Sequence, residues 1–460
     1  MMQKKILIVL TALFLMLLSA CSSSNSSTSG SQTEGESTGG AGAEETSGKQ
    51  EVVFWHAMSG ELETVLNDIA ADFNESQDTI EVKPIFQGTY EEALTKFNTV
   101  AGTEDAPTIM QVFEVGTKYM IDSGHIQPVQ KFIDEENYDT SQWEKNISNY
   151  YTVDGEQYSM PFNSSTPVLI YNKDAFEAAG LDPEKAPMTY SELKDAAKKL
   201  TKAEGGETSQ YGFSILNYGW FFEELLAEQG GHYVDNENGR AGNATKATFN
   251  DDLGLNVFQL ISDMHKEGTY YNVGQNWDDM RAAFQSGKMA MYLDSSAGVK
   301  AIVDNADFEV GVSYLPIPDD SERNGVIIGG ASVWMSSGIA EEKQKAAWEF
   351  MKYLTTPEVQ AEWHVKTGYF AINPAAYDED VVTQEWEKYP QLKVTVDQLR
   401  DTKTNTATQG ALISVFPESR QKVVTAMESL YQGMDPQEAL DQAAEETNRA
   451  LEVANKKQGN

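Results

Sequence analysis

Strand and helix signals alternate at the start of the globular part of the chain. Residues 52–55 form a short apolar run typical of a buried strand, and residues 60–74 repeat large apolar side chains on one helical face. The alternation continues with a strand at 80–86, a helix near 90–100 and a strand at 108–113. This order predicts an α/β fold, in which a parallel or mixed sheet is covered by helices.

The turns that follow these three strands carry polar residues and glycine. They lie at 56–60, 87–90 and 114–117. In open α/β sheets the carboxyl ends of the strands meet at one edge, and ligands bind there. We therefore expect the three turns to contribute to one binding site.

Further secondary-structure signals begin after residue 161. A strand is predicted at 168–171, and Thr189-Tyr190-Ser191-Glu192 forms a capping box that opens a helix. Residues 220–226 are apolar and aromatic, whereas 235–243 form an acidic loop rich in Asn and Gly. The remaining predicted elements are a helix at 278–285, a strand at 289–293, helices at 343–354 and 358–366, and an amphipathic helical stretch from Pro417 to about residue 457.

The N-terminus has the three parts of an export signal. Lys4 and Lys5 precede an apolar run that is too short for a comfortable membrane span, and small residues follow it. The closing Leu18-Ser19-Ala20-Cys21 resembles the bacterial lipobox, which implies cleavage after residue 20 and lipid on Cys21. The alternative is an ordinary signal peptide with an incidental cysteine. Cys21 is the only cysteine of the chain, so the body is expected to fold without disulfides.

Residues 22–50 contain no aromatic or large aliphatic side chain. Such a stretch buries too little apolar surface to offset the entropy of ordering, and it is predicted to be a disordered tether. A Gly/Ser-type coil of this length has a root-mean-square reach of roughly 30 Å. The tether would let the folded body move close to its anchor.

The chain is strongly acidic. Its formal net charge is −37, and loss of the signal peptide with Lys4 and Lys5 makes it more negative still. Acidic residues repel nucleic acid and anionic lipid, so DNA or RNA is not expected as a partner.

Signals for catalysis and metal binding are weak. The five histidines are isolated from one another, and no P-loop or dinucleotide fingerprint occurs in the body. A formal nucleophile-elbow match, Gly35-Glu36-Ser37-Thr38-Gly39, lacks the strand and helix that the motif requires. We therefore expect neither a metal nor a cofactor, and no enzymatic activity. A secreted hydrolase is kept as an alternative hypothesis, which release of free phosphate from a phosphate ester by the purified protein would support.

Several loops combine small hydroxyls, glycines and aromatic rings. Hydroxyls, backbone N–H groups and ring faces can hold a small polyhydroxylated or phosphorylated ligand without reacting with it. Each loop on its own is also typical of an ordinary turn. The loops are Phe54-Trp55-His56, Gly88-Thr89-Tyr90, Asn163-Ser164-Ser165-Thr166, Ser295-Ser296, Ile328-Gly329-Gly330-Ala331-Ser332 and Thr367-Gly368-Tyr369.

Residues 51–455 resemble a known family. The chain is similar to the extracellular solute-binding proteins of ABC importers, of the large sugar-binding type that includes maltose-binding proteins, and within it to members that bind sn-glycerol 3-phosphate. Two segments are shared with the wider family, Ile170-Tyr171-Asn172-Lys173-Asp174-Ala175-Phe176 and Phe284-x-x-Gly287-Lys288-x-Ala290-Met291. Five more specific segments are Phe54-Trp55-His56-x-Met58-x-Gly60-Glu61, Gln111-Val112-Phe113-Glu114-Val115-Gly116-Thr117, Pro161-Phe162-Asn163-Ser164-Ser165-Thr166-Pro167-Val168-Leu169, Ile327-Ile328-Gly329-Gly330-Ala331-Ser332 and Glu362-Trp363-His364-x-Lys366-Thr367-Gly368-Tyr369.

The resemblance implies a two-lobed periplasmic-binding-protein-like fold of type II. Residues 51–164 and 331–376 would form lobe 1, and residues 165–330 and 377–460 would form lobe 2. The chain would cross between the lobes near 163–166, near 329–331 and after Pro374, and the lobes would close around the ligand. The implied partners are a small phosphorylated polyol and the permease and ATPase subunits of an importer. The protein would act as a monomer at the outer face of the cytoplasmic membrane, in a cell that lacks an outer membrane.

The resemblance also implies a set of ligand-binding residues: Tyr90, Glu114, Ser165, Ser295, Gly330, Tyr369 and Arg420, with Trp220 as a cleft wall. Arg420 has the bidentate geometry that phosphate recognition requires, and Glu114 is an acceptor for glycerol hydroxyls. Structural alternatives are a packing role for Tyr90, a capping role for Glu114 and a surface ion pair for Arg420. Ala371 stands where the family usually has proline.

Two ligand classes follow. The first is sn-glycerol 3-phosphate or a glycerophosphodiester such as glycerophosphocholine. The second is an oligosaccharide, which predicts stacking by Trp55 and Trp220 and tolerance of the loss of Arg420.

Overall fold

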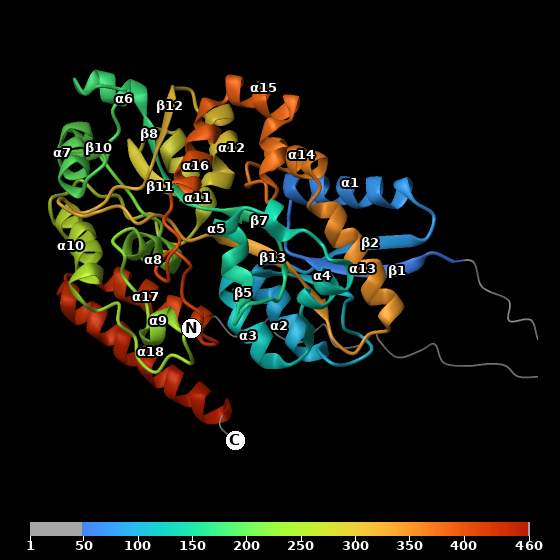
Figure 1. Cartoon of the computed structure of the whole chain (residues 1–460). Helices are drawn as coiled ribbons and strands as arrows, with labels where there is room; N and C mark the ends of the chain where they lie inside the picture. Colours follow the sequence, from blue (N-terminus) through green and yellow to red (C-terminus); the bar gives the residue numbers. More distant parts are fainter. Residues whose placement is uncertain (1–47, 459–460) are drawn as a thin grey trace, which may run out of the picture. The chain divides into compact units, whose positions relative to one another are not determined.

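The computed structural model describes residues 48–458 (Figure 1). The predicted signal peptide, Cys21 and the predicted tether up to residue 47 lie outside the described residues. The end of the predicted tether belongs to the body, because β1 (Gln50–His56) begins two residues before Val52. Lys49 Nζ also donates hydrogen bonds to the carbonyls of Asn74 and Gln77, at 2.7 and 2.8 Å.

The first sheet is mixed, as the alternation of signals predicts. Its strand order is β2-β1-β3-β13-β4, and β7 also pairs with β13. The pairs β1/β2 and β1/β3 are parallel, whereas β13 runs antiparallel to β3, β4 and β7. The bounds are β2 (Ile80–Phe86), β3 (Ile109–Phe113), β4 (Ile126–Gln127), β7 (Met160–Ser165) and β13 (Gly329–Ser336).

Helices cover both faces of the first sheet. The Phe54 ring of β1 packs against Phe350 of α13 at 6.0 Å between centroids, in a core shared with α1. Leu94 and Phe97 of α2 belong to the other core, together with Val112 of β3. The elements are α1 (Glu61–Ser76), α2 (Tyr90–Val100), η1 (Glu114–Gly116), α3 (Thr117–Ser123), α4 (Gln130–Glu136), η2 (Thr140–Gln142), α5 (Lys145–Ser148), η3 (Asn149–Tyr151), a small hairpin of β5 (Thr152–Val153) and β6 (Glu156–Gln157), α13 (Glu341–Leu354) and α14 (Pro357–Thr367).

The second sheet is antiparallel and has the strand order β11-β8-β12. Its strands are β8 (Pro167–Asn172), β11 (Met291–Ser295) and β12 (Val310–Ser313). The other elements of this part are α6 (Lys173–Ala178), α7 (Tyr190–Leu200), the hairpin β9 (Lys202–Glu204) and β10 (Glu207–Gln210), α8 (Gly219–Ala227), α9 (Asp235–Asn238), α10 (Asp252–Lys266), α11 (Trp277–Gln285), η4 (Ser296–Gly298), α12 (Val299–Asn305), η5 (Pro374–Asp378), α15 (Asp380–Lys388), α16 (Pro390–Arg400), α17 (Phe416–Leu430) and α18 (Pro436–Gln458).

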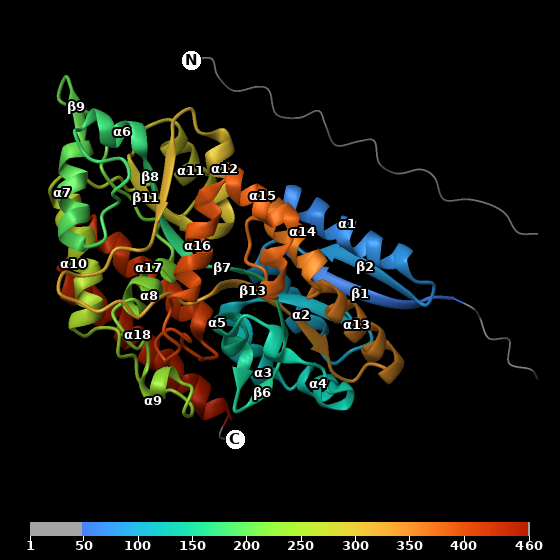
Figure 2. The same cartoon turned by 45° about the horizontal axis from the view of Figure 1, so that its top comes forward.

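The chain passes from one sheet to the other at short connections. Only Thr166 separates β7 of the first sheet from β8 of the second. Its carbonyl accepts a hydrogen bond from Ser296 N at 2.8 Å, and its N–H donates to Ser296 Oγ at 3.2 Å. The chain returns to the first sheet at Gly329, where β13 begins. Figures 1 and 2 show β7 and β13 between the α1/β1/β2 part and the α7/α10 part. The exact limits of the two lobes stay a prediction.

Two predicted elements differ from the structure. The helical stretch after Pro417 is divided into α17 and α18, because Gly433 adopts a φ of 89° and Asp435 Oδ1 accepts hydrogen bonds from the N–H groups of Gln437 and Glu438. Strand β11 begins at Met291 and not at residue 289. Met289 forms an isolated bridge with Tyr211 instead. The capping box at Thr189 is confirmed at the start of α7.

Helix α8 is buried along its whole length, although it carries acidic residues. Glu223, Glu224 and Glu228 are 3%, 0% and 0% exposed. Glu224 has no cationic partner among the described residues, and its Oε2 accepts a hydrogen bond from Ile327 N at 2.8 Å. Burial raises the pKa of Glu224 well above its ordinary value, and it raises the pKa of Glu228 to about 7. Within residues 48–458, no helix combines the length and apolar character of a membrane span.

Candidate functional site

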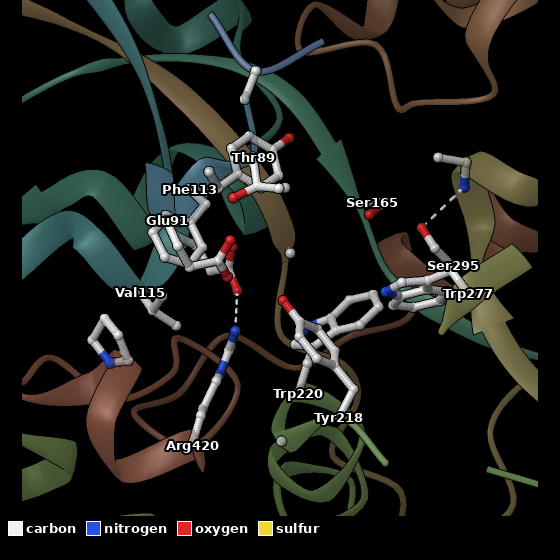
Figure 3. Close-up of a pocket in the computed structure, with 18 of the residues that line it drawn as sticks. Thr89, Glu91, Phe113, Val115, Ser165, Tyr218, Trp220, Trp277, Ser295 and Arg420 are labelled. Carbon is white, nitrogen blue, oxygen red and sulfur yellow. Dashed lines mark hydrogen bonds and ion pairs between the residues drawn. The ribbon is translucent and has the colours of Figure 1, made fainter. Parts of the chain in front are cut away.

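A cavity of about 1000 Å³ lies where the three predicted turns meet. All three turns contribute lining residues, for example Ser59, Thr89 and Val115. The expected convergence of the three turns is therefore confirmed, whereas ligand binding at the cavity stays a prediction. The other walls come from α8, α11, η4 and α17, and Figure 3 shows Trp220 of α8, Trp277 of α11 and Arg420 of α17.

The structure brings every predicted site residue of the body to this cavity. The set is Tyr90, Glu114, Ser165, Trp220, Ser295, Gly330, Tyr369 and Arg420. These residues come from α2, η1, β7, α8, β11, β13, the loop after α14, and α17. That they bind a ligand stays a prediction. Trp55, which the oligosaccharide hypothesis uses for stacking, is not among the lining residues.

Tyr90 is held by a chain of buried amides. Gln111 Oε1 accepts a hydrogen bond from Ala57 N at 2.8 Å, and Gln111 Nε2 donates to Asn163 Oδ1 at 2.7 Å. Asn163 Nδ2 in turn donates to the Tyr90 hydroxyl at 2.9 Å. The Tyr90 ring stacks on Phe113 with 5.5 Å between centroids. Tyr90 is thus both the first residue of α2 and a fixed wall of the cavity.

Arg420 lies between two carboxylates. Its Nε and Nη2 atoms donate to Glu223 in a bidentate pair, with 2.9 Å between Nη2 and Oε2. Its Nη1 lies 2.7 Å from Glu114 Oε1, the contact drawn as a dashed line at Arg420 in Figure 3. Arg420 is only 6% exposed, so the alternative of a surface ion pair is wrong. The capping role for Glu114 is also wrong, since neither η1 nor α3 has a side-chain cap.

Burial and the neighbouring charges have opposite effects on the pKa values of Glu114, Glu223 and Arg420. Burial raises the pKa of Glu114 and raises that of Glu223 to about 7, although Arg420 lowers both. For Arg420, burial lowers the pKa but the two carboxylates outweigh it, so the guanidinium stays charged. With both carboxylates ionised, the three side chains carry a net charge of −1.

A second arginine, Arg281, also lines the cavity. Arg281 of α11 forms two hydrogen bonds of 3.0 Å with Asp294, a residue that is 0% exposed. The guanidinium lies over the Trp277 ring, 5.5 Å from its centroid. Asp294 Oδ1 also accepts from Ser295 N at 2.6 Å, which fixes the backbone at Ser295. The Arg281–Asp294 ion pair therefore positions Ser295 and Trp277.

Aromatic side chains also line the cavity. Trp220 packs against Gly329 so closely that a Cβ on the glycine would lie 2.6 Å from the ring. Tyr218 lies edge-on to Trp277 with 5.6 Å between centroids, and Figure 3 shows both beside Trp220. The predicted role of Trp220 as a wall agrees with this packing.

The residues that were not predicted include Glu91, Tyr218, Trp277 and Arg281 of the cavity lining, and Glu223, which holds Arg420 from outside the lining. Tyr218 precedes the aromatic run at 220–226. Trp277 directly precedes the helix predicted at 278–285, and Arg281 lies within it. A search for aromatic and cationic side chains near predicted helix starts would have selected them. Glu223 gave no such signal, because it sits inside an apolar helix.

Comparisons with known proteins agree with this geometry. A model of the family described as bacterial extracellular solute-binding protein matches residues 68–394. The sn-glycerol-3-phosphate-binding periplasmic protein UgpB of Yersinia pseudotuberculosis is 36% identical over 417 residues, which cover 88% of this chain and 94% of that protein. The UgpB protein of Escherichia coli O6:K15:H31 is 36% identical over 408 residues, with 87% and 92% covered.

Solved structures share the fold. UgpB from Mycobacterium tuberculosis, in complex with glycerophosphocholine, has a TM-score of 0.76 and 22% identity, and the match covers 89% of this chain and 100% of that one. The cyclic alpha-maltosyl-1,6-maltose binding protein from Arthrobacter globiformis has a TM-score of 0.73 and 23% identity, with 88% and 99% covered. The predicted two-lobed α/β fold is confirmed by these likenesses.

Proposed function

Because this chain belongs to the bacterial extracellular solute-binding protein family, we propose that it is the receptor of an ABC importer for sn-glycerol 3-phosphate or a glycerophosphodiester. It would bind the solute between its lobes as a monomer and deliver it to the permease, which ATPase subunits drive. Relatives that are named for sn-glycerol 3-phosphate cover most of the chain and support this ligand class.

The observation that carries the proposal is that the eight predicted site residues, which come from different helices, strands and loops, all line one cavity. Arg420 would contact the phosphate, and Ser165, Ser295 and the Gly330 N–H would add directed hydrogen bonds. Glu114 and the tyrosine hydroxyls would face the glycerol hydroxyls. A cavity of about 1000 Å³ leaves room for a diester head group beside the glycerol phosphate.

Ser165 offers a clean test of the site. Its side chain lines the cavity and has no hydrogen-bond partner within residues 48–458, so Ser165→Ala breaks no described contact. A hydrogen bond to a charged group contributes about 1.5–3 kcal/mol, so we expect Ser165→Ala to weaken binding at least tenfold by calorimetry. Ser164→Ala is the matched control, because that buried hydroxyl also lacks a partner but lies outside the cavity lining.

The ligand panel contains sn-glycerol 3-phosphate, glycerophosphocholine and a maltooligosaccharide. Heat with a phosphorylated ligand, reduced by Ser165→Ala and not by Ser164→Ala, is the expected result. Heat with the oligosaccharide alone would refute the proposed ligand class.

One observation favours the oligosaccharide as a second candidate. The cavity is lined by the aromatic side chains of Tyr218, Trp220 and Trp277, and aromatic faces suit sugar rings. Some solved structures with this fold are named for maltose-type sugars. The same calorimetric panel decides between the two classes.

We also propose that Cys21 carries lipid and holds the protein at the outer face of the cytoplasmic membrane, in a cell without an outer membrane. The lipobox-like Leu18-Ser19-Ala20-Cys21 supports this. In such a host, Cys21→Ser should shift the protein from the membrane fraction to the medium. Unchanged membrane association of the variant would contradict the lipid anchor.

A further inference from the structure

The guanidinium of Arg420 is enclosed by its two carboxylate partners. Its side chain is 7% exposed, so little of it is accessible to a solute while both partners stay in place. Glu223 holds it through two hydrogen bonds and lies outside the cavity lining. Glu114 makes one contact, at Nη1, and lines the cavity. A phosphate that approaches from the cavity therefore meets Arg420 at the position that Glu114 occupies.

Among residues 48–458, Glu114 has no other cation to pair with. The charged and titratable groups that face it come from five directions: Arg420 of α17, Glu223 of α8, Glu91 of α2, Tyr150 and Tyr151 of η3, and the tyrosines of the cavity, Tyr90, Tyr218 and Tyr369. Arg420 is the only cation in this set. Arg281 also lines the cavity but is paired with Asp294, and no lysine or histidine in the described part of the chain lines it.

Keeping Glu114 ionised would cost free energy once its carboxylate lost the ion pair with Arg420. Glu114 is 5% exposed, and one of its carboxyl oxygens would face the phosphate at hydrogen-bonding distance, while the other stays available to the glycerol hydroxyls. Two anions that close together in a buried site cannot both stay charged at low cost. A protonated Glu114 removes the repulsion and donates its O–H to a phosphate oxygen. Burial already raises the pKa of this carboxyl before any ligand enters.

We propose that an entering phosphate takes the Nη1 position on Arg420 from Glu114, and that Glu114 takes up one proton from solvent as it gives up that contact. The Arg420–Glu114 ion pair breaks, an Arg420–phosphate ion pair forms, and the proton ends on a carboxyl oxygen of Glu114. The inference rests on the proposed phosphorylated ligand. In this proposal, protonation of Glu114 offsets the negative charge that the phosphate brings into the cavity.

Calorimetry in two buffers of different ionisation enthalpy counts the protons. Glycerophosphocholine is the decisive probe, because a phosphodiester does not titrate near neutral pH, whereas a phosphomonoester has a second pKa of about 6 and could itself take the proton. At pH 7.5 we expect the wild-type protein to take up close to one proton per glycerophosphocholine bound. Glu114→Gln mimics the protonated carboxyl, so it should bind without proton uptake.

Glu418→Gln is the matched control. Glu418 is an exposed carboxylate on the same helix as Arg420, and it lies outside the cavity lining. It should show the wild-type proton count. Unchanged proton uptake in Glu114→Gln would overturn the assignment to Glu114, as would wild-type binding with no uptake.

The pH dependence of the wild-type protein gives a second readout that needs no variant. Uptake of one proton on binding means that affinity for glycerophosphocholine falls about tenfold for each unit of rising pH near neutrality. An affinity that is constant between pH 6.5 and 8 would overturn the proposal. Absence of binding to every phosphorylated ligand at any pH would refute the proposed function and this inference with it, whereas binding without proton coupling refutes the inference alone.

Discussion

Gly330 is predicted to be the least replaceable glycine of the site. Its φ is 91°, and a Cβ built on it would lie 1.9 Å from the carbonyl oxygen of Asn163 on the paired strand β7. That oxygen is backbone, so it cannot rotate away as a side chain would. Gly330→Ala must therefore separate β13 from β7 at the point where both strands line the cavity.

The cost has two parts. An L-residue with left-handed backbone costs roughly 1–2 kcal/mol. Separation of the strands also weakens about two ladder hydrogen bonds, each worth about 0.5–1.5 kcal/mol. We expect Gly330→Ala to lower the free energy of unfolding by about 2–5 kcal/mol, which urea denaturation with an unchanged m-value would measure.

Gly338→Ala separates the two parts. Gly338 has a φ of 75°, but no atom lies within 4 Å of its Cβ position. This variant carries the backbone cost without the clash, and it should lose only about 1–2 kcal/mol. Equal losses in the two variants would refute the argument that the approach of β13 to Asn163 requires glycine at 330.

Three further predictions concern buried polar groups. Burial raises the folded-state pKa of Glu224, so its contribution to the free energy of unfolding falls as pH rises above the unfolded pKa of 4.5. Glu224→Gln should therefore raise the melting temperature at pH 8 and make the melting temperature less dependent on pH. An unchanged profile of melting temperature against pH would contradict this prediction. Burial lowers the pKa of His364 to about 4, so its contribution is lost as pH falls from 6.5 towards 4; melting curves of His364→Gln should lack that loss. Gln111→Met leaves Ala57 N and Asn163 Oδ1 without their hydrogen-bond partner. We expect urea denaturation to show a free energy of unfolding lower by about 2–4 kcal/mol, and ligand binding to weaken because Tyr90 loses its support. Wild-type stability and affinity would argue against the amide chain as the support of Tyr90.

Local sequence patterns predicted much of the fold for identifiable reasons. The apolar periodicity of residues 60–74 produced α1 within two residues of its observed ends, and the hydroxyl and carboxyl of the Thr189 box cap α7 as expected. The division of the C-terminal stretch was also readable, since Asp435-Pro436 is a helix-start signal and Gly433 a stop signal. Apolar periodicity alone had merged the two helices.

The charge environment of the site could not be predicted in the same way. Arg420 and Glu223 are separated by 197 positions, and Glu223 lies in a helix whose other side chains are mostly apolar. Nothing local indicates that these two residues form a buried pair. The resemblance to the family placed Arg420 at the site, but only the tertiary structure shows that two carboxylates already occupy its guanidinium.

The Thr166 connection limits how the two sheets can move. Ser165 is paired with Gly329 in the first sheet and Pro167 with Ser295 in the second, so the joint is one residue long. Since Ser296 holds both backbone groups of Thr166, this joint can twist but has no slack for sliding. A longer solute would have to be admitted by a wider opening angle, and the distance between the sheets at this pivot would stay the same.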